Sequence, residues 1–208
     1  IAFFMPVLWA LVTDNRAFYA YLMTTLGLVP GSILQLRDLY SLFTSMFVHA
    51  DLMHIAGNML YLHIFGDNVE DVLGRARFLL FYFACGLVAS LTHVLICFLT
   101  GKGLDIPLVG ASGAISGLLA AYAVFFPRAR IVTLTLRAPG PIYVRASYYI
   151  IAWFLYQAVW AFAVMAFGLE VSVAFWAHIG GFLAGLLMGL VFKEEVRLRA
   201  SERAWIGW

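Results

Sequence analysis

The apolar residues of this chain are gathered into blocks, and the longest blocks approach the length of a membrane-crossing helix. A helix rises 1.5 Å per residue, so about 20 apolar residues cross the ~30 Å hydrocarbon layer of a bilayer. Of the 208 residues, 64% are hydrophobic and only 12% are charged, against roughly a quarter charged in an ordinary soluble domain. A soluble core of this size cannot hold so many apolar side chains. The sequence therefore predicts a protein that folds in lipid.

Six apolar blocks follow one another, at residues 1–12, 51–65, 78–100, 112–126, 146–168 and 174–192. Each is expected to be a helix, because lipid cannot satisfy an unpaired backbone and the alternating pattern of a barrel strand is absent. The first block is too short to cross a bilayer and lacks a basic start or a cleavage site, so we interpret it as the end of a truncated first span. The expected fold is an all-α, polytopic membrane helix bundle, with residues 1–208 in one domain.

Basic residues predict an orientation for this bundle. Ten of the 13 Lys and Arg residues lie in the loops after the second and fourth blocks and in the tail. These ten are Arg75, Arg77, Arg128, Arg130, Arg137, Arg145, Lys193, Arg197, Arg199 and Arg203. By the positive-inside rule these segments, and with six spans both termini, are cytoplasmic. We expect a multi-pass protein of the plasma membrane. Its first loop, residues 13–50, would lie outside at the membrane interface, as a packed connector or as a gate for substrate.

Several other classes of site are not expected. The net charge of +2 and the absence of a basic, aromatic-rich patch argue against nucleic acid. Cys85 and Cys97 would lie roughly 18 Å apart along one helix, which is too far for a disulfide. The five-residue spacing of His49 and His54 does not place both rings on one helix face, and no H-E-x-x-H motif is present. We therefore expect no metal and no cofactor.

Polar side chains in membrane helices are costly, which makes them candidates for function. Ser112 opens the fourth block, after Gly110 and before Gly113 and Gly117. Small residues in such a helix usually mark close packing, so a packing role is the ordinary interpretation of Ser112. The flanking glycines also let backbone amides approach an oxyanion at a helix N-terminus, where the helix dipole favours negative charge.

A histidine opens the sixth block in a comparable setting. His178 precedes Gly181 and Gly185, which recur every fourth residue and favour close packing against another small-residue helix such as the fourth block. His178 lies three residues before Gly181 and so belongs to the same face. A lone histidine there is often only a hydrogen-bonded packing residue, but Ser112 offers it a partner.

The predicted topology brings the polar sites to one depth. The second, fourth and sixth blocks all run from outside to inside, and His54, Ser112 and His178 lie near their starts. Asn58 lies one turn after His54 on the same face. The fourth block extends only about 15 residues beyond Ser112, roughly 22 Å of helix, so we expect Ser112 below the outer surface in a wet pocket.

These motifs together resemble the rhomboid family of intramembrane serine proteases, over nearly the whole chain from about Leu28 onward. The likeness rests on His54 with Asn58, on GASG at Gly110–Gly113 and on AHIGGFLAG at Ala177–Gly185. It implies the six-transmembrane-helix rhomboid fold. Some bacterial members carry a Trp-Arg pair in the first loop, where this chain has Tyr40 and Ser41. Some also carry, one turn after the nucleophile, an aromatic ring that stacks on the base, and this chain has Ser116 at that position. No residue is thereby assigned to orient the base.

The resemblance also implies roles for single residues. Ser112 would be the nucleophile and His178 the general base, without an acidic third member. His54 and Asn58 would form the side-chain part of an oxyanion hole that the backbone amide of Ser112 completes. His49 matches a first-loop histidine without an assigned role. Structural or helix-packing roles fall on Glu70, Gly66, Gly110, Gly113, Gly117, Gly181 and Gly185.

The function implied is that of an intramembrane serine endopeptidase that cleaves single-pass transmembrane substrates near the outer membrane face through an acyl-enzyme. One alternative is a catalytically inactive rhomboid-like protein that binds client transmembrane helices. Such relatives usually lack the nucleophile or the base, and this chain keeps both. A small transporter is a further alternative, against which stands the absence of an inverted repeat or of a broken-helix pair.

Overall fold

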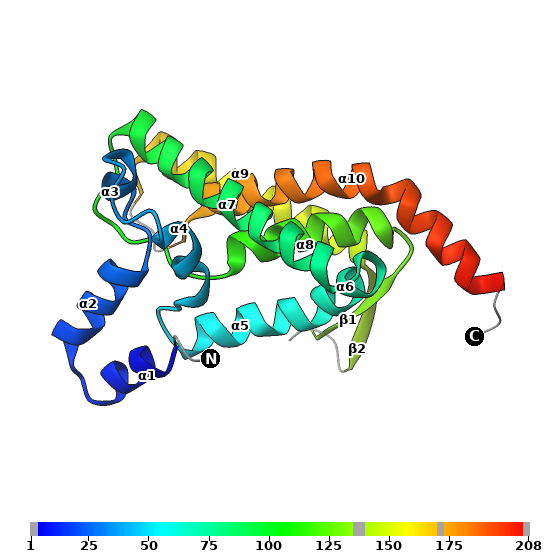
Figure 1. The fold of residues 1–208 in the computed structure, drawn as a ribbon, viewed down its shortest axis with the longest axis horizontal. Coiled ribbons are helices and arrows are strands. Elements are labelled where there is room, and N and C mark those ends of the chain that lie inside the picture. The colour runs from blue at the N-terminus through cyan, green and yellow to red at the C-terminus, as the bar shows by residue number, and fades with distance from the viewer. Residues whose placement is uncertain (1–3, 135–139, 170–172, 206–208) are drawn as a thin grey trace.

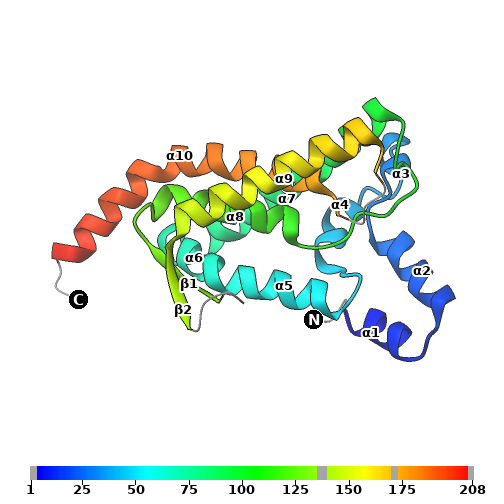
Figure 2. The ribbon, with the colours of Figure 1, turned by 180° about the vertical axis from the view of Figure 1, so that it is seen from behind.

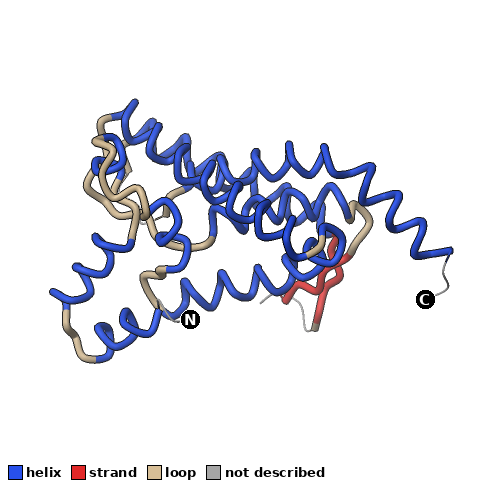
Figure 3. Tube along the Cα trace, in the orientation of Figure 1, coloured by secondary structure: helices blue, strands red, loops and turns tan. Residues whose placement is uncertain are grey.

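Helices make up most of the described chain, and one pair of strands interrupts them (Figure 3). The computed structural model describes residues 4–134, 140–169 and 173–205. Residues 1–3 of the first predicted block, Arg137, and the side chains of Arg199 and Arg203 lie outside the described part. In chain order the elements are α1 (Phe4–Val12), α2 (Arg16–Leu26), α3 (Pro30–Leu34), α4 (Ser41–Thr44), the 3-10 turn η1 (Ser45–Phe47), α5 (Leu52–Tyr61), the π-helical turn η2 (Leu62–Gly66), α6 (Asp67–Leu73), α7 (Arg75–Thr100), α8 (Ser112–Phe125), β1 (Arg130–Leu134), β2 (Pro141–Arg145), α9 (Ala146–Phe167) and α10 (Phe175–Trp205).

Three of these helices are long and apolar enough to cross a membrane. They are α7, α9 and the part of α10 from Phe175 to Leu198. Helix α8 is apolar but shorter, and helices also overlap the remaining predicted blocks, with α1 in the first and α5 and η2 in the second. The protein is thus a helical membrane protein, while the count of six spans stays a prediction.

Helix α8 lies at the centre of the bundle. Helix α7 runs across the front in Figure 1, α9 runs across the front in Figure 2, and α8 lies between them with α10 alongside. Every residue of α8 from Gly113 to Tyr122 is buried. Small and apolar side chains at all of these positions allow neighbours on every side of the helix. The start of α8 is therefore held inside the protein rather than against lipid.

Glycines bring α8 and α10 into backbone contact. A Cβ added at Gly181 would overlap the carbonyl oxygen of Gly113, and one added at Gly185 would overlap that of Gly117. Because no side chain separates the two backbones at these levels, the helix axes approach more closely than ordinary side chains permit. The glycine faces of the fourth and sixth blocks are the surfaces that meet.

The expectation of an all-α fold is wrong at the loop after α8. This loop forms an antiparallel hairpin in which β1 pairs with β2, with Val132 opposite Tyr143 and Thr133 opposite Ile142. Both strands are rich in β-branched residues, which favour extended backbone. They lie beyond the apolar helices, at the end of the bundle that also holds α6 and the end of α10 (Figure 1). In the sequence, the basic residues of this segment indicated only a charged loop.

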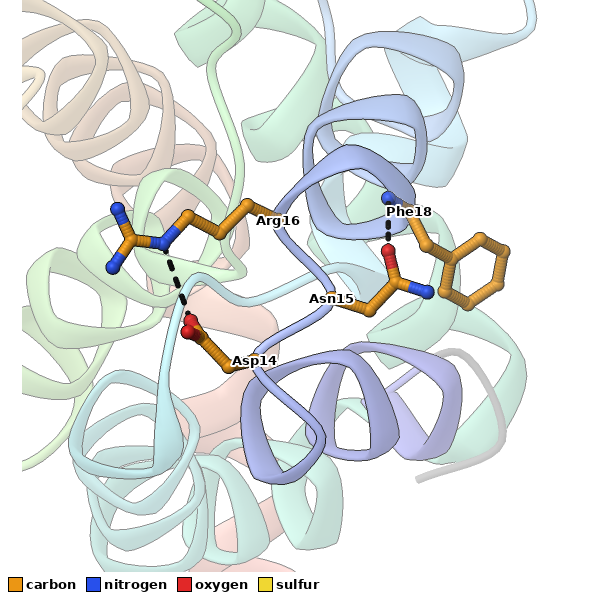
Figure 4. Close-up of polar contacts among 4 residues, drawn as sticks. All are labelled: Asp14, Asn15, Arg16 and Phe18. Carbon is orange, nitrogen blue, oxygen red and sulfur yellow. Dashed lines mark hydrogen bonds and ion pairs between the residues drawn. The ribbon is translucent and has the colours of Figure 1, made fainter.

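The first loop is folded into short helices. Asn15 caps α2, since its Oδ1 accepts a hydrogen bond of 3.1 Å from the Phe18 N–H, and Arg16 pairs with Asp14 beside it (Figure 4). The Tyr40 hydroxyl donates to the carbonyl oxygen of Thr25 at 2.9 Å. Tyr40 therefore anchors the loop at the place where some bacterial members of the family that this chain resembles have a Trp-Arg pair.

Replacing Gly185 with alanine is expected to destabilise the protein, because the added methyl group overlaps the Gly117 backbone. Overpacking of this kind costs about 1–3 kcal/mol. The matched control is Gly57→Ala in α5, where an added Cβ has no neighbour within 4 Å and alanine improves helix propensity. Thermal unfolding in one detergent measures both variants. Equal midpoints for Gly185→Ala and the unaltered protein would contradict the backbone contact.

Candidate active site

Ser112 is the first residue of α8 and lies far below the end of α7. A Cβ at the next residue, Gly113, would press on Ala89 of α7. Ala89 is eleven residues before Thr100, the last residue of α7, which corresponds to about 16 Å along the helix. Figure 1 shows α8 beginning part-way along α7. The Ser112 side chain is half-buried at this depth.

The side chain of His178 joins Ser112 to a third residue. The Ser112 Oγ lies 2.8 Å from Nε2 of His178, close enough for the hydroxyl to donate to that nitrogen. The other ring nitrogen, Nδ1, lies 2.8 Å from Oε1 of Gln157 in α9. Trp153, one turn before Gln157, places its ring centroid 5.8 Å from that of His178 at a tilt of 38°. Both ring nitrogens therefore have an oxygen partner.

Gln157 and Trp153 are the site residues that the sequence analysis missed. The available signal was a polar side chain inside an apolar block, since Gln157 lies within residues 146–168. Polar residues in membrane helices are functional candidates by default. Ser116 occupies the position at which some bacterial members of the family that this chain resembles stack an aromatic ring on the base. It does not contact the base in place of Gln157 and Trp153, because its hydroxyl donates to the Ser112 carbonyl oxygen at 2.6 Å.

Two side-chain donors converge on Gly110, two residues before Ser112. A Cβ at Gly110 would lie 2.6 Å from Nε2 of His54 and 3.6 Å from Nδ2 of Asn58. Gly110 has φ +112°, and the absence of a side chain lets both donors lie this close to its backbone. Asn58 is buried, and its Nδ2 has no hydrogen-bond partner within the described ranges. A buried donor without a partner calls for an explanation, and an anion that binds there supplies one.

The start of α5 orients His54. Its backbone N–H donates to the capping carboxylate of Asp51 at 2.8 Å. Its ring Nδ1 faces the Ala50 N–H at 3.4 Å and accepts from it. A neutral imidazole that accepts at Nδ1 carries its proton on Nε2. The nitrogen nearest Gly110 is therefore the donor.

His49 packs against His54 from the first loop. The two rings meet edge to face with centroids 5.1 Å apart. Burial, followed by the neighbouring His54, lowers the pKa of His49 to about 4. His49 is therefore uncharged near neutral pH and contributes packing rather than charge.

The remaining predicted residues lie away from Ser112. Glu70 is in α6, at the other end of the bundle, where it faces Arg75 at 3.6 Å. Gly66 ends the π-helical turn, and a Cβ there would lie 2.9 Å from a methyl group of Leu62. These contacts join Glu70 and Gly66 to neighbouring residues and do not involve Ser112.

Comparison with known proteins identifies the family. A family model of the rhomboid domain matches residues 36–195, which is most of the chain. The chain belongs to the rhomboid family. The match includes all the residues that converge at Ser112.

Three relatives illustrate how far the similarity extends. The chain is 28% identical to rhomboid protein 1, mitochondrial, of Saccharomyces cerevisiae, over 94% of the chain and 52% of the yeast protein. It is 31% identical to RHOMBOID-like protein 1 of Arabidopsis thaliana, over 75% of the chain and 35% of that protein. It is 33% identical to the human presenilin-associated rhomboid-like protein, mitochondrial, over 44% of the chain and 24% of that protein.

Two consequences follow from these relatives. The chain spans about half of the yeast protein and less of the other two. Two of the three names place the relative in mitochondria. The comparisons therefore support a membrane protein but do not support the expectation of a plasma-membrane location.

Replacing Gly110 with alanine in this rhomboid protein is expected to slow the reaction of Ser112 with a fluorophosphonate at least tenfold. The added methyl group would fill the space next to His54 Nε2, where donors are needed for a developing oxyanion. Mass spectrometry of the labelled protein measures the rate. The matched control is Gly74→Ala, which shares a positive φ, +80°, but has no atom within 4 Å of the added Cβ. Equal rates for the two variants would argue against an oxyanion site at Gly110.

Proposed function

We propose that this rhomboid protein is an intramembrane serine endopeptidase that cleaves single-pass transmembrane proteins near the outer membrane face. The observation that carries the proposal is the 2.8 Å approach of Ser112 Oγ to His178 Nε2. A serine hydroxyl is a weak nucleophile until a base within hydrogen-bond reach accepts its proton. A protein that only holds client helices has no use for this pair.

Acylation is the first step that we propose. Ser112 Oγ attacks the carbonyl carbon of the scissile peptide while His178 Nε2 accepts the hydroxyl proton. The negative charge develops on the former carbonyl oxygen, next to Gly110. There His54 Nε2–H, Asn58 Nδ2–H and the Ser112 amide at the N-terminus of α8 can donate to it. These donors are held in position by α5 and α8 before the charge develops, which is what makes such donors effective.

The intermediate then collapses, and the proton on His178 passes to the leaving amine as the peptide C–N bond breaks. The ester on Ser112 remains. A water molecule gives its proton to His178 and attacks the ester, and His178 returns that proton to Ser112 Oγ. The cycle needs no group beyond these side chains and water.

The site also constrains the substrate. A transmembrane helix hides its carbonyl groups in its own hydrogen bonds, so the segment that reaches Ser112 must be unwound. The recessed position of Ser112 favours a bond in or near the membrane-embedded end of such a helix. We further propose that residues 1–208 form one domain, with the β1–β2 hairpin and the end of α10 on the cytoplasmic side, as the basic residues indicate.

Replacement of Ser112 or His178 by alanine is expected to abolish cleavage of a tagged single-span substrate in liposomes, because each variant lacks the nucleophile or its base. Gel analysis of the products over time measures the rate. The control is Ser147→Ala, which removes a serine hydroxyl at the start of α9, far along the chain from α8. Undiminished cleavage by Ser112→Ala would refute the protease. Capture of the intact substrate without cleavage by the unaltered protein would favour the client-binding alternative.

Loss of either oxyanion donor is expected to slow turnover rather than binding. One such donor is worth about 10²–10³ in kcat, so His54→Ala and Asn58→Ala should show that loss with a nearly unchanged KM. The control is His63→Ala, because His63 lies further along the same helical run and pairs with Asp67. Unchanged kcat for both donor variants would remove them from the oxyanion hole.

A further inference from the structure

The proposed mechanism leaves the proton on the second nitrogen of His178 without a function. For Nε2 to accept the Ser112 proton, the neutral ring must carry its own proton on Nδ1. Which nitrogen is protonated depends on the hydrogen bond that the other one makes. An acidic third residue does this in many serine proteases. In the described ranges, the partner of Nδ1 is the amide of Gln157.

The position of Gln157 on α9 makes its polarity unusual. The buried residues of α9 are Ala146, Ile150, Gln157 and Ala161, which form one stripe toward the bundle. Gln157 is the polar member of this stripe and is only 5% exposed. An amide in such a place is costly unless it is hydrogen-bonded. Its contact with His178 at 2.8 Å supplies that bond.

Trp153 and Gln157 hold the ring from the same side. They are four residues apart and so project from one face of α9. Gln157 meets the ring at Nδ1, and the Trp153 ring packs beside it at a centroid distance of 5.8 Å. The two contacts together limit rotation of the imidazole about its χ angles. Helix α9 therefore supplies the support that Ser116 in α8 does not.

We propose that Gln157 is a positioning residue for His178. Its Oε1 accepts the Nδ1–H, which holds the ring in the tautomer whose Nε2 faces Ser112. A neutral amide does this without a carboxylate charge, which would be expensive to bury in a membrane bundle. When His178 takes the Ser112 proton, the same oxygen stabilises the imidazolium. This inference rests on the proposed protease function.

The first test compares variants of Gln157 in the liposome assay. Gln157→Met keeps the length of the side chain but removes the acceptor, so kcat should fall about tenfold with KM unchanged. Gln157→Glu keeps an oxygen at the same position and should restore most of kcat. Leu155→Met, at an exposed position of the same helix, is the matched control. A full kcat in Gln157→Met, or a change in KM alone, would overturn the inference.

The second test needs no substrate. Nitrogen-15 NMR of histidine-labelled protein in detergent reports which ring nitrogen is protonated, and His178→Asn identifies the signals. The Nδ1–H tautomer is expected in the unaltered protein, and a mixture of tautomers in Gln157→Met. The same tautomer in both proteins would overturn the assignment. Cleavage by Ser112→Ala would contradict the proposed protease function without affecting the NMR result. An unchanged tautomer in Gln157→Met would contradict only the role of Gln157, so the two failures are distinguishable.

Discussion

The backbone contact between α8 and α10 is the constraint on which the site depends. Gly113 and Gly117 meet Gly181 and Gly185 without an intervening side chain. Ser112 precedes the first of these levels by one residue, and His178 precedes its partner level by three. The contact that holds the two helices together therefore also sets the distance between the hydroxyl and the imidazole. A side chain at either glycine level would separate the pair as well as the helices.

The polar groups near this contact differ in whether they have hydrogen-bond partners. His178 has a partner at each nitrogen, and His54 has the Ala50 amide at Nδ1. Asn58 Nδ2 is buried with no partner within the described residues. A buried donor in that state costs roughly 1–3 kcal/mol. An oxyanion that forms only during the reaction would recover this cost at that moment, which is how a folding penalty becomes stabilisation of a transition state.

The site is assembled from four helices that contribute different functions. In the proposed mechanism, helix α8 supplies the nucleophile, α10 supplies the base, α5 supplies the side-chain donors and α9 supplies the support of the base. Helices α5, α8 and α10 each contribute from a residue near their start, where unpaired N–H groups and the dipole favour negative charge. Gln157 of α9 contributes from the middle of its helix. It contacts the imidazole of His178.

The sequence by itself predicted a helical membrane protein and found His54, Ser112 and His178 near the starts of three apolar blocks. These follow from residue type, because apolar length and charge bias are local properties of the chain. Ser112, His54 and His178 were identifiable since each lies near the start of a block that the charge bias is predicted to orient the same way. The β1–β2 hairpin was not predicted, because the basic residues of this short segment indicated a charged loop and outweighed the signal from its β-branched residues.

Only the tertiary structure decided that Ser112 and His178 are within hydrogen-bond reach and that Gln157 and Trp153 contact the imidazole. A glutamine in the fifth block has no sequence neighbour that reveals its partner, which lies 21 residues away on another helix. Its direction depends on how α9 is rotated about its axis, and packing against α8 and α10 sets that rotation. Helix packing therefore decides which residues contact one another at the site, whereas the sequence shows only which residues are candidates.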